Sequence, residues 1–174
     1  MELCTAKNMD YVKALYFEAF PKAERKPFSV IEKMRDEGIC DILEIKENGK
    51  PCGLAVAERA EGCALLDYFA VDPGKRGGGI GGRALEQLCR RYSEGGFFLE
   101  IESTFEKSAG NMQERISRKR FYLNRGFFET GCEIMLYGVR MELLSCKQPI
   151  PFEVMDKVYR RIYADVYNKA VKRL

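Results

Sequence analysis

The sequence contains no histidine, and this absence excludes several common catalytic centres. A Ser-His-Asp triad, a Cys-His dyad and an HExxH metal site all require an imidazole. Proton transfer must therefore use aspartate, glutamate, tyrosine, lysine, cysteine or water.

The seven cysteines show no CxxC spacing, so they indicate neither a disulfide framework nor a zinc cluster. We expect thiols in a reducing cytoplasm and no metal.

Long apolar runs and a strong charge imbalance are also missing. The uncharged apolar stretches are far shorter than the ~20 residues that a membrane-spanning helix needs. The first residues, Met1–Cys4, show no basic segment followed by an apolar one, so no secretory signal is expected. A net charge of +3 is too small to indicate nucleic-acid binding by itself. We therefore expect a cytoplasmic protein with neither a membrane nor a nucleic acid as partner.

The length and patterning indicate one α+β domain. The 174 residues are 46% hydrophobic and 32% charged, as in ordinary globular proteins. Apolar runs predict a meander of strands at 39–46, 52–60 and 64–71, and Asn48-Gly49 is a strong hairpin signal. Further strands are expected at 97–102, 132–136 and 140–144. Apolar residues three and four apart predict helices at 9–20, 29–38, 80–95, 113–125 and 152–172. The result is a mixed, mostly antiparallel sheet flanked by helices.

The last predicted helix forms a C-terminal extension. We place its boundary at the two prolines, Pro149 and Pro151, so that residues 1–148 form the main domain and 149–174 the extension. Tyr159, Tyr163 and Tyr167 line one stripe of this helix. A stripe of this kind is typical of packing, either on the same domain or against a second copy in a homodimer.

A glycine cluster, "VDPGKRGGGIGG" at residues 71–82, separates a predicted strand from a predicted helix. Glycine costs roughly 0.5–1 kcal/mol relative to alanine inside a regular element, so the cluster needs an explanation. The first N–H groups of a helix lack internal partners, and the helix dipole favours negative charge there. The cluster therefore predicts a phosphate-binding loop, flanked by Lys75, Arg76 and Arg83. A flexible connector without a ligand is the alternative.

The same loop formally matches the dinucleotide fingerprint GxGxxG through Gly77, Gly79 and Gly82. Glu100 follows about twenty residues later, where a ribose-binding acid would lie. The preceding strands form a hairpin meander rather than the start of a βαβ unit. A nicotinamide-dependent oxidoreductase is therefore a weaker hypothesis.

The segment "DYFAVDPGKRGGGIGGRAL" resembles the central motif of the GCN5-related N-acetyltransferases, the GNAT superfamily. In that family a strand ending in Val-x-Pro is followed by Arg/Gln-x-x-Gly-x-Gly/Ala, which Arg76–Gly81 matches. A second family motif, Tyr-x-x-x-Gly-Phe, is matched by residues 122–127. The resemblance covers about residues 64–128 and implies a GNAT-like fold.

The resemblance also implies a set of residues that bind acetyl-CoA. The loop amides hold the pyrophosphate, and the backbone of the preceding strand binds the pantetheine arm. Many members carry Asn and Ala where this chain has Arg115 and Arg118, and an asparagine occurs instead at Asn111. The basic helix carrying these arginines is either a solvated face or a contact for the coenzyme's 3′-phosphate or for an acidic acceptor. The expected coenzyme-binding residues are Phe69, Ala70, Val71, Arg76, Gly77, Gly78, Gly79, Ile80, Gly81, Gly82, Arg83 and Asn111.

Acetyl transfer to an amine also requires acid and base groups. An alkylammonium with a pKa near 10.4 costs about 4.6 kcal/mol to deprotonate at pH 7, so a base or a path to solvent is needed. Glu100 and Glu102 project from one strand face and Asp67 from the adjoining strand, and each is a candidate base or simply an exposed carboxylate. By the resemblance, Tyr122 protonates the leaving thiolate.

The sequence thus predicts an N-acetyltransferase that moves acetyl from acetyl-CoA to a primary amine of a small molecule or peptide, by direct attack in a ternary complex. The alternative is a catalytically inactive sensor or scaffold that binds CoA or acetyl-CoA. The sequence does not identify the acceptor.

Overall fold

The computed structural model describes residues 1–174, and the chain folds into two compact units. Unit 1 comprises residues 1–59 and 66–91, and unit 2 comprises residues 60–65 and 92–174. No helix is long and apolar enough to cross a membrane.

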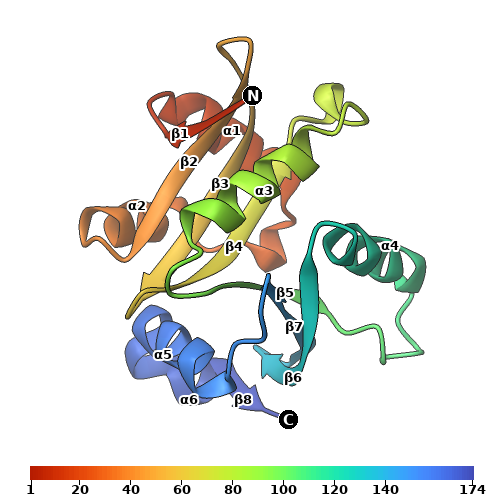
Figure 1. The fold of residues 1–174 in the computed structure, drawn as a ribbon. Helices are drawn as coiled ribbons and strands as arrows, with labels where there is room; N and C mark the ends of the chain where they lie inside the picture. Colours follow the sequence, from red (N-terminus) through yellow and green to blue (C-terminus); the bar gives the residue numbers. More distant parts are fainter. The chain divides into compact units, whose positions relative to one another are not determined.

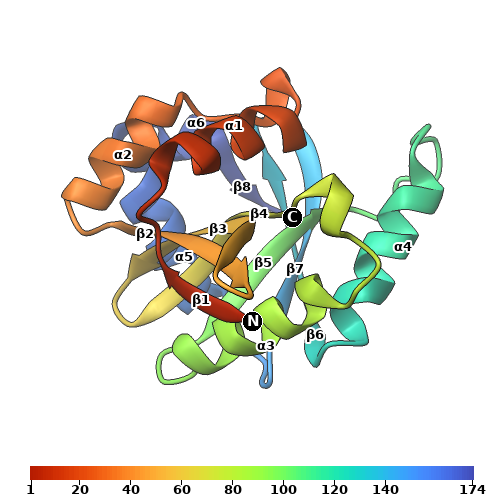
Figure 2. The same cartoon turned by 90° about the horizontal axis from the view of Figure 1, so that it is seen from above.

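Unit 1 contains the first four strands, which lie in the order β1-β2-β3-β4. β1, β2 and β3 are successively antiparallel. The strands lie between α1 and α2 on one face and α3 on the other (Figures 1 and 2). The tips of β3 and β4, within residues 60–65, belong to unit 2. The elements in chain order are β1 (Glu2–Thr5), α1 (Met9–Ala19), η1 (Lys22–Glu24), α2 (Phe28–Asp36), β2 (Cys40–Glu47), β3 (Lys50–Ala60), β4 (Cys63–Val71), η2 (Pro73–Lys75) and α3 (Ile80–Arg91).

The local sequence explains how these elements begin and turn. Asn8 caps α1, because its side chain accepts a hydrogen bond from the N–H of Tyr11. Asn48 and Gly49 both adopt positive φ, as the predicted tight hairpin between β2 and β3 requires. On the α3 side, Ile45 and Cys52 of the sheet pack with Ile80 of α3. This packing fixes the start of α3, and therefore the position of the glycine loop that precedes it.

Unit 2 contains the other four strands in the order β5-β7-β6-β8, with every neighbouring pair antiparallel. Its core includes Phe98 of β5, Leu143 of β7 and three residues of α5, namely Met155, Val158 and Tyr159. The elements are β5 (Phe97–Glu102), α4 (Met112–Leu123), β6 (Phe127–Leu136), β7 (Val139–Cys146), α5 (Phe152–Tyr163), η3 (Ala164–Val166), α6 (Tyr167–Ala170) and β8 (Val171–Arg173). The α+β class and the mostly antiparallel pairing predicted from the sequence are confirmed.

The C-terminal helix is shorter than the sequence predicts. α5 ends at Tyr163 rather than near residue 172, because Ala164 adopts a positive φ of 39° and interrupts the helix. Two short helical turns follow, which explains why the apolar period continues beyond the break. The chain then adds β8 to the edge of β6, where Val171 pairs with Leu136.

Two further differences concern strands. β1 was not expected, because its four residues carry no alternation: Leu3 and Cys4, which are half-buried, are adjacent, and Glu2 and Thr5 are exposed. β6 begins at Phe127 instead of residue 132, and its pairing with β7 is irregular between Glu129 and Glu133. Gly131, at a φ of 72°, lies in this irregular part. In the sequence, a glycine at this position indicates a turn, so the strand was predicted to begin only after it.

Candidate active site

The glycine loop connects the end of β4 to the start of α3 within unit 1. Residues 73–79 are exposed, whereas Ile80 is buried and anchors the helix. Gly77 and Gly79 adopt φ values of 87° and 74°, in the left-handed region that favours glycine. A Cβ added at Gly77 or Gly78 would meet nothing within 4 Å. Glycine is therefore required at 77 and 79 by backbone conformation, while at 78 the fold itself does not require it.

The last backbone amides of this loop have no hydrogen-bond acceptor within the chain. The N–H groups of residues 77–82 donate to no acceptor in the chain, and the first helical bond runs from Arg83 N to the Gly79 carbonyl at 3.1 Å. Consecutive unpaired N–H groups at a helix N-terminus bind phosphate groups well, because the helix dipole adds to their partial positive charge. The sequence-based hypothesis of a phosphate-binding loop thus has the local geometry that it needs.

Two arginines form hydrogen bonds within the loop and to neighbouring parts of unit 1. Arg76 Nε donates to the carbonyl of Val71 at 2.9 Å. Arg83 donates to the carbonyl of Gly78 at 2.8 Å and to Glu47 Oε1 at 2.5 Å. Both side chains therefore shape the loop, and direct contacts from them to a phosphate stay a prediction.

The segment expected to bind pantetheine is the last part of β4. Phe69 and Val71 are half-buried, and Ala70 is buried. A Cβ at Gly53 of β3 would lie 2.6 Å from the Ala70 carbonyl oxygen, too close for any real side chain. Gly53 therefore permits the close approach of β3 to this end of β4.

Asp67, one of the expected carboxylates, belongs to a buried charged cluster in unit 1. Lys26 Nζ, from the segment between η1 and α2, donates to Glu58 Oε1 at 2.9 Å and to Asp67 Oδ2 at 2.6 Å. Glu58 of β3 is 0% exposed, and its second oxygen, Oε2, has no hydrogen-bond partner. Burial first, and then the Asp67 charge, raise the pKa of Glu58 to about 8 against the opposing effect of Lys26.

Two tyrosines hold the backbone of Lys26 in place. The N–H of Lys26 donates to the Tyr68 hydroxyl at 3.0 Å, and its carbonyl accepts from the Tyr16 hydroxyl at 2.9 Å. The Tyr68 hydroxyl donates in turn to the carbonyl of Glu24 at 3.1 Å. These bonds involve the main chain, so the segment is positioned independently of the Lys26 side chain.

Tyr122, the expected proton donor, lies at the end of α4 in unit 2. Its half-buried ring contacts Phe121 and Phe127 edge to face. Burial raises the pKa of the Tyr122 hydroxyl to about 12, and the nearby Arg118 guanidinium partly opposes this rise. The hydroxyl therefore stays protonated across neutral pH, as a proton donor requires.

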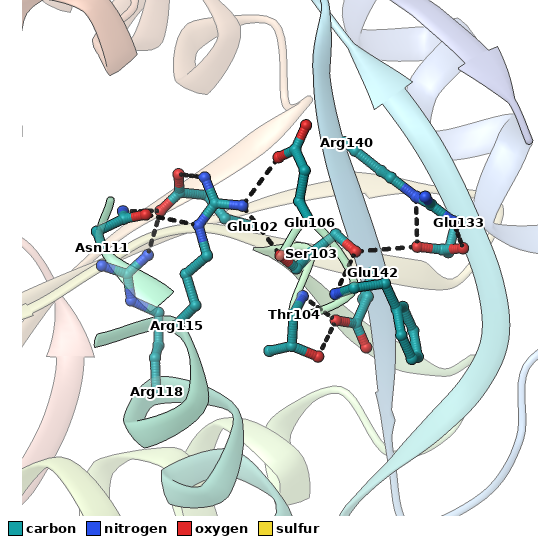
Figure 3. A network of polar contacts seen from close by, with 11 residues as sticks. Glu102, Ser103, Thr104, Glu106, Asn111, Arg115, Arg118, Glu133, Arg140 and Glu142 are labelled. Carbon is teal, nitrogen blue, oxygen red and sulfur yellow. Dashed lines mark hydrogen bonds and ion pairs between the residues drawn. The ribbon is translucent and has the colours of Figure 1, made fainter. Parts of the chain in front are cut away.

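The two glutamates of β5 are each engaged within unit 2. Glu100 Oε2 accepts a hydrogen bond from the Tyr159 hydroxyl at 2.6 Å. Glu102 lies 2.7 Å from Arg115 Nη2 and 3.5 Å from Arg118 Nη1, and it also accepts from the Asn111 amide at 3.1 Å. Figure 3 shows Arg115 and Arg118 converging on Glu102.

Arg115, at a position where many members of the resembled family carry asparagine, is a buried residue of α4 whose side chain binds groups of the β5–α4 connection. Its guanidinium donates to the Ser103 carbonyl at 2.9 Å, to Glu106 at 3.0 Å and to the Asn111 side-chain oxygen at 2.8 Å (Figure 3). The Asn111 side chain is thus used on both its oxygen and its nitrogen. Arg115 is therefore neither part of a solvated face nor exposed for a ligand, while Arg118 and Arg120 are exposed.

A second network near this connection was not anticipated from the sequence. Buried Glu142 of β7 accepts from the N–H and hydroxyl of Thr104 and pairs with Lys119 at 2.5 Å. Burial alone raises the pKa of a carboxyl, but the bonds from Lys119 and Thr104 lower the pKa of Glu142 overall. Ser103 bonds to Glu133, which also accepts from Arg140, as Figure 3 shows.

Comparison with known proteins decides the family. The sequence model described as "Acetyltransferase (GNAT) family" matches residues 9–127, which is more than half of the chain and includes both the glycine loop and Tyr122. The chain belongs to the GNAT family.

Solved structures of other GNAT proteins share the fold. A structure named as an acetyltransferase from the GNAT family from Bacteroides thetaiotaomicron is 20% identical, covering 96% of this chain and 98% of that chain with a TM-score of 0.73. An aminoglycoside 6′-N-acetyltransferase complexed with coenzyme A is 18% identical, covering 87% and 99% with a TM-score of 0.64. A GNAT family acetyltransferase from Elizabethkingia anophelis with acetyl-CoA bound is 14% identical, covering 74% and 95% with a TM-score of 0.51. No curated protein sequence matches the chain.

This GNAT protein is therefore an acetyltransferase that uses acetyl-CoA. The glycine loop, Asp67 and Tyr122 stay predictions as site residues, and the sequence did not indicate the Lys26 contact of Asp67 or the Glu58 that shares Lys26 with it. A signal for Glu58 does exist, because it is in phase with Leu54 and Val56 on β3 and so occupies a core-facing position. A charged residue at such a position needs a partner, and Lys26 supplies it from a distant segment.

Proposed function

We propose that this GNAT acetyltransferase transfers the acetyl group of acetyl-CoA to a primary amine of a small-molecule or peptide acceptor, by direct attack in a ternary complex. The observation that carries the proposal is the run of unpaired backbone N–H groups at residues 77–82 before α3. Such a run suits the pyrophosphate of the coenzyme, and the Phe69–Val71 backbone suits its pantetheine arm. The name of the aminoglycoside acetyltransferase neighbour adds support for an amine acceptor.

In this mechanism the neutral amine nitrogen attacks the thioester carbonyl, the C–N bond forms and the C–S bond breaks. Tyr122 then donates its proton to the departing thiolate, and the proton that the nitrogen releases on forming the amide reprotonates Tyr122 through solvent. Among the three expected carboxylates, Asp67 is favoured as the base by its position on β4, two residues before Phe69. All three have partners: Glu102 pairs with two arginines, Glu100 accepts from Tyr159, and Asp67 pairs with Lys26.

The loop can be tested by adding a negative charge where the fold tolerates it. Gly78 and Gly110 both have open space where a side-chain carbon would lie, and neither has a positive φ, so Gly78→Asp and Gly110→Asp are matched variants with the same net charge. Calorimetry should show acetyl-CoA binding weakened at least about 10-fold by Gly78→Asp, because the carboxylate repels the diphosphate. The Gly110→Asp protein should bind like the unsubstituted one.

Turnover distinguishes the enzyme from a binding protein. Release of free thiol from acetyl-CoA, measured with a panel of primary amines, should exceed the amine-free rate for at least one acceptor. Binding without amine-dependent thiol release would instead support a CoA sensor or scaffold. Failure to bind acetyl-CoA or CoA at millimolar concentration would contradict both functions.

A further inference from the structure

The buried cluster of Lys26, Glu58 and Asp67 has an unusual charge balance. Two carboxylates and one ammonium leave one negative charge uncompensated in a site where the Asp67 side chain is only 9% exposed and Glu58 is 0% exposed. Isolated charge is costly in the protein interior. Adding one proton to the carboxylates makes the cluster neutral, so the geometry favours the uptake of a proton.

The contacts show where such a proton would be held. Oε1 of Glu58 accepts from Lys26, whereas the buried Oε2 has no partner and retains its lone pairs. After burial, the nearby charge of Asp67 is the main contribution to the raised pKa of Glu58. Both carboxylates accept from the same Lys26 ammonium, so a proton bound by Glu58 changes the charge that Asp67 and Lys26 face.

The cluster is also well placed along β4. Asp67 precedes Phe69 by two residues, which corresponds to about 7 Å along a strand. Phe69 begins the backbone segment to which the proposed function assigns the pantetheine arm and thioester. The Glu58 side chain is 0% exposed and the Asp67 side chain 9%, so Asp67 is the more exposed of the two carboxylates.

We propose that Glu58 and Asp67 act as one proton-accepting pair in the acetyl transfer, with the Lys26 ammonium as their counter-charge. This proposal rests on the proposed function. In the productive state both carboxyls are ionised. The acceptor ammonium loses one N–H proton to Asp67, the proton is then shared with Glu58, and the neutral amine attacks the thioester. Glu58 and Lys26 are positioning residues that act through Asp67.

The titratable groups that face this pair come from several elements. They include Tyr68 on β4, Tyr16 on α1 and Cys40, which pairs with Glu58 across β2 and β3. Burial raises the pKa values of all three, so they stay protonated near neutral pH. The charge that changes around neutrality is therefore that of the carboxyl pair.

The first experiment measures the pair in the unliganded protein. Carbon-13 NMR of the glutamate side-chain carboxyls, with Glu58 assigned from the Glu58→Gln spectrum, should show Glu58 titrating at least two pH units above an ordinary glutamate. The Asp67→Asn substitution should lower that midpoint, because it removes the repelling charge. A Glu58 carboxyl that titrates below pH 5 with the other glutamates overturns the proposal, whatever the activity of the enzyme.

The second experiment uses the pH dependence of turnover with an active amine. In the profile of kcat against pH, Glu58→Gln should shift the acidic limb by at least one pH unit toward lower pH, because Asp67 loses its anionic neighbour. Lys26→Met should move the limb to higher pH, because the counter-charge is lost while the main-chain bonds of residue 26 remain. The KM for acetyl-CoA should stay within about two-fold of the unsubstituted value in both variants.

The matched control is Glu44→Gln. Glu44 is also 0% exposed, but its two oxygens accept from the backbone N–H groups of Lys7 and Asn8, just before α1, and it pairs with Lys46 rather than with the Lys26 cluster. Its substitution should leave the acidic limb of the pH profile unmoved.

If NMR shows the shared proton but Glu58→Gln and Lys26→Met leave the acidic limb in place, the pair has no role in catalysis and the proposal fails. Absence of turnover with every amine refutes the proposed function and the catalytic role of the pair, while the NMR result still decides whether the two carboxyls share a proton.

Discussion

At the scale of single residues, the hydroxyl of Tyr122 is the most informative atom to remove. Tyr122→Phe keeps the ring contacts with Phe121 and Phe127 and deletes only the proton donor. We expect kcat to fall roughly 10- to 1,000-fold, the usual range for acid catalysis, with acetyl-CoA affinity within about two-fold. Steady-state kinetics and calorimetry measure the two quantities.

Tyr137→Phe provides the matched control for this substitution. Tyr137 is exposed, lies in the β6–β7 turn, and its ring contacts Tyr163 edge to face. Its variant should retain full turnover. Equal rates for Tyr122→Phe and the unsubstituted enzyme would remove Tyr122 from the mechanism.

Single residues differ in how far the sequence predicts them. Gly77 and Gly79 were recognisable because a glycine run at a strand–helix junction is visible in the sequence. The Lys26–Glu58 pair was not, because 32 positions separate its members and no local pattern links them. Ion pairs between distant segments depend on the tertiary fold, which a single sequence does not encode in any local period.

At the scale of elements, the approach of β3 to β4 gives a prediction on stability. Gly53→Ala places a Cβ 2.6 Å from the Ala70 carbonyl oxygen and 2.9 Å from a side-chain carbon of Ile45, so a backbone must move. We expect a loss of about 1–3 kcal/mol in the free energy of unfolding, the usual cost of overpacking. Denaturant unfolding measures this loss.

Gly110→Ala is the comparison for this stability change. Nothing lies within 4 Å of its added carbon, and its φ is not positive. It should change the free energy of unfolding by less than about 0.5 kcal/mol. Similar stabilities for the two alanine variants would mean that the β3–β4 approach accommodates a side chain.

Elements with a strong local signal were predicted well, and those that depend on pairing were not. α3 and β5 follow directly from apolar periodicity and flanking glycines. The end of α5 did not, because the interruption occurs at Ala164, a residue of positive φ that is neither a proline nor a glycine. A helical period can thus continue through a point where the chain leaves the helix.

At the scale of the whole molecule, the raised pKa of Glu58 links stability to pH. The folded protein binds this proton up to about pH 8, whereas an ordinary glutamate releases it near 4.5. The folded state therefore binds more protons between these values, and its stability must fall as pH rises through that window. The stabilisation that this proton contributes is fully present below about pH 4.5 and is lost above about pH 8.

The measurement compares melting of the unsubstituted protein with Glu58→Gln between pH 5 and pH 9. The unsubstituted protein should lose at least about 1.4 kcal/mol relative to the variant across this range, which corresponds to one pKa unit. A stability difference that is constant with pH would contradict the shift.

The division of the chain between the two units has a consequence for biosynthesis. The polypeptide leaves unit 1 after Arg59, returns at Leu66 and leaves again after Arg91. On the ribosome, unit 1 has all of its residues once Arg91 emerges, while unit 2 holds only residues 60–65 of its own. The segment that carries the unpaired amides can therefore acquire its shape on the nascent chain before unit 2 has emerged in full.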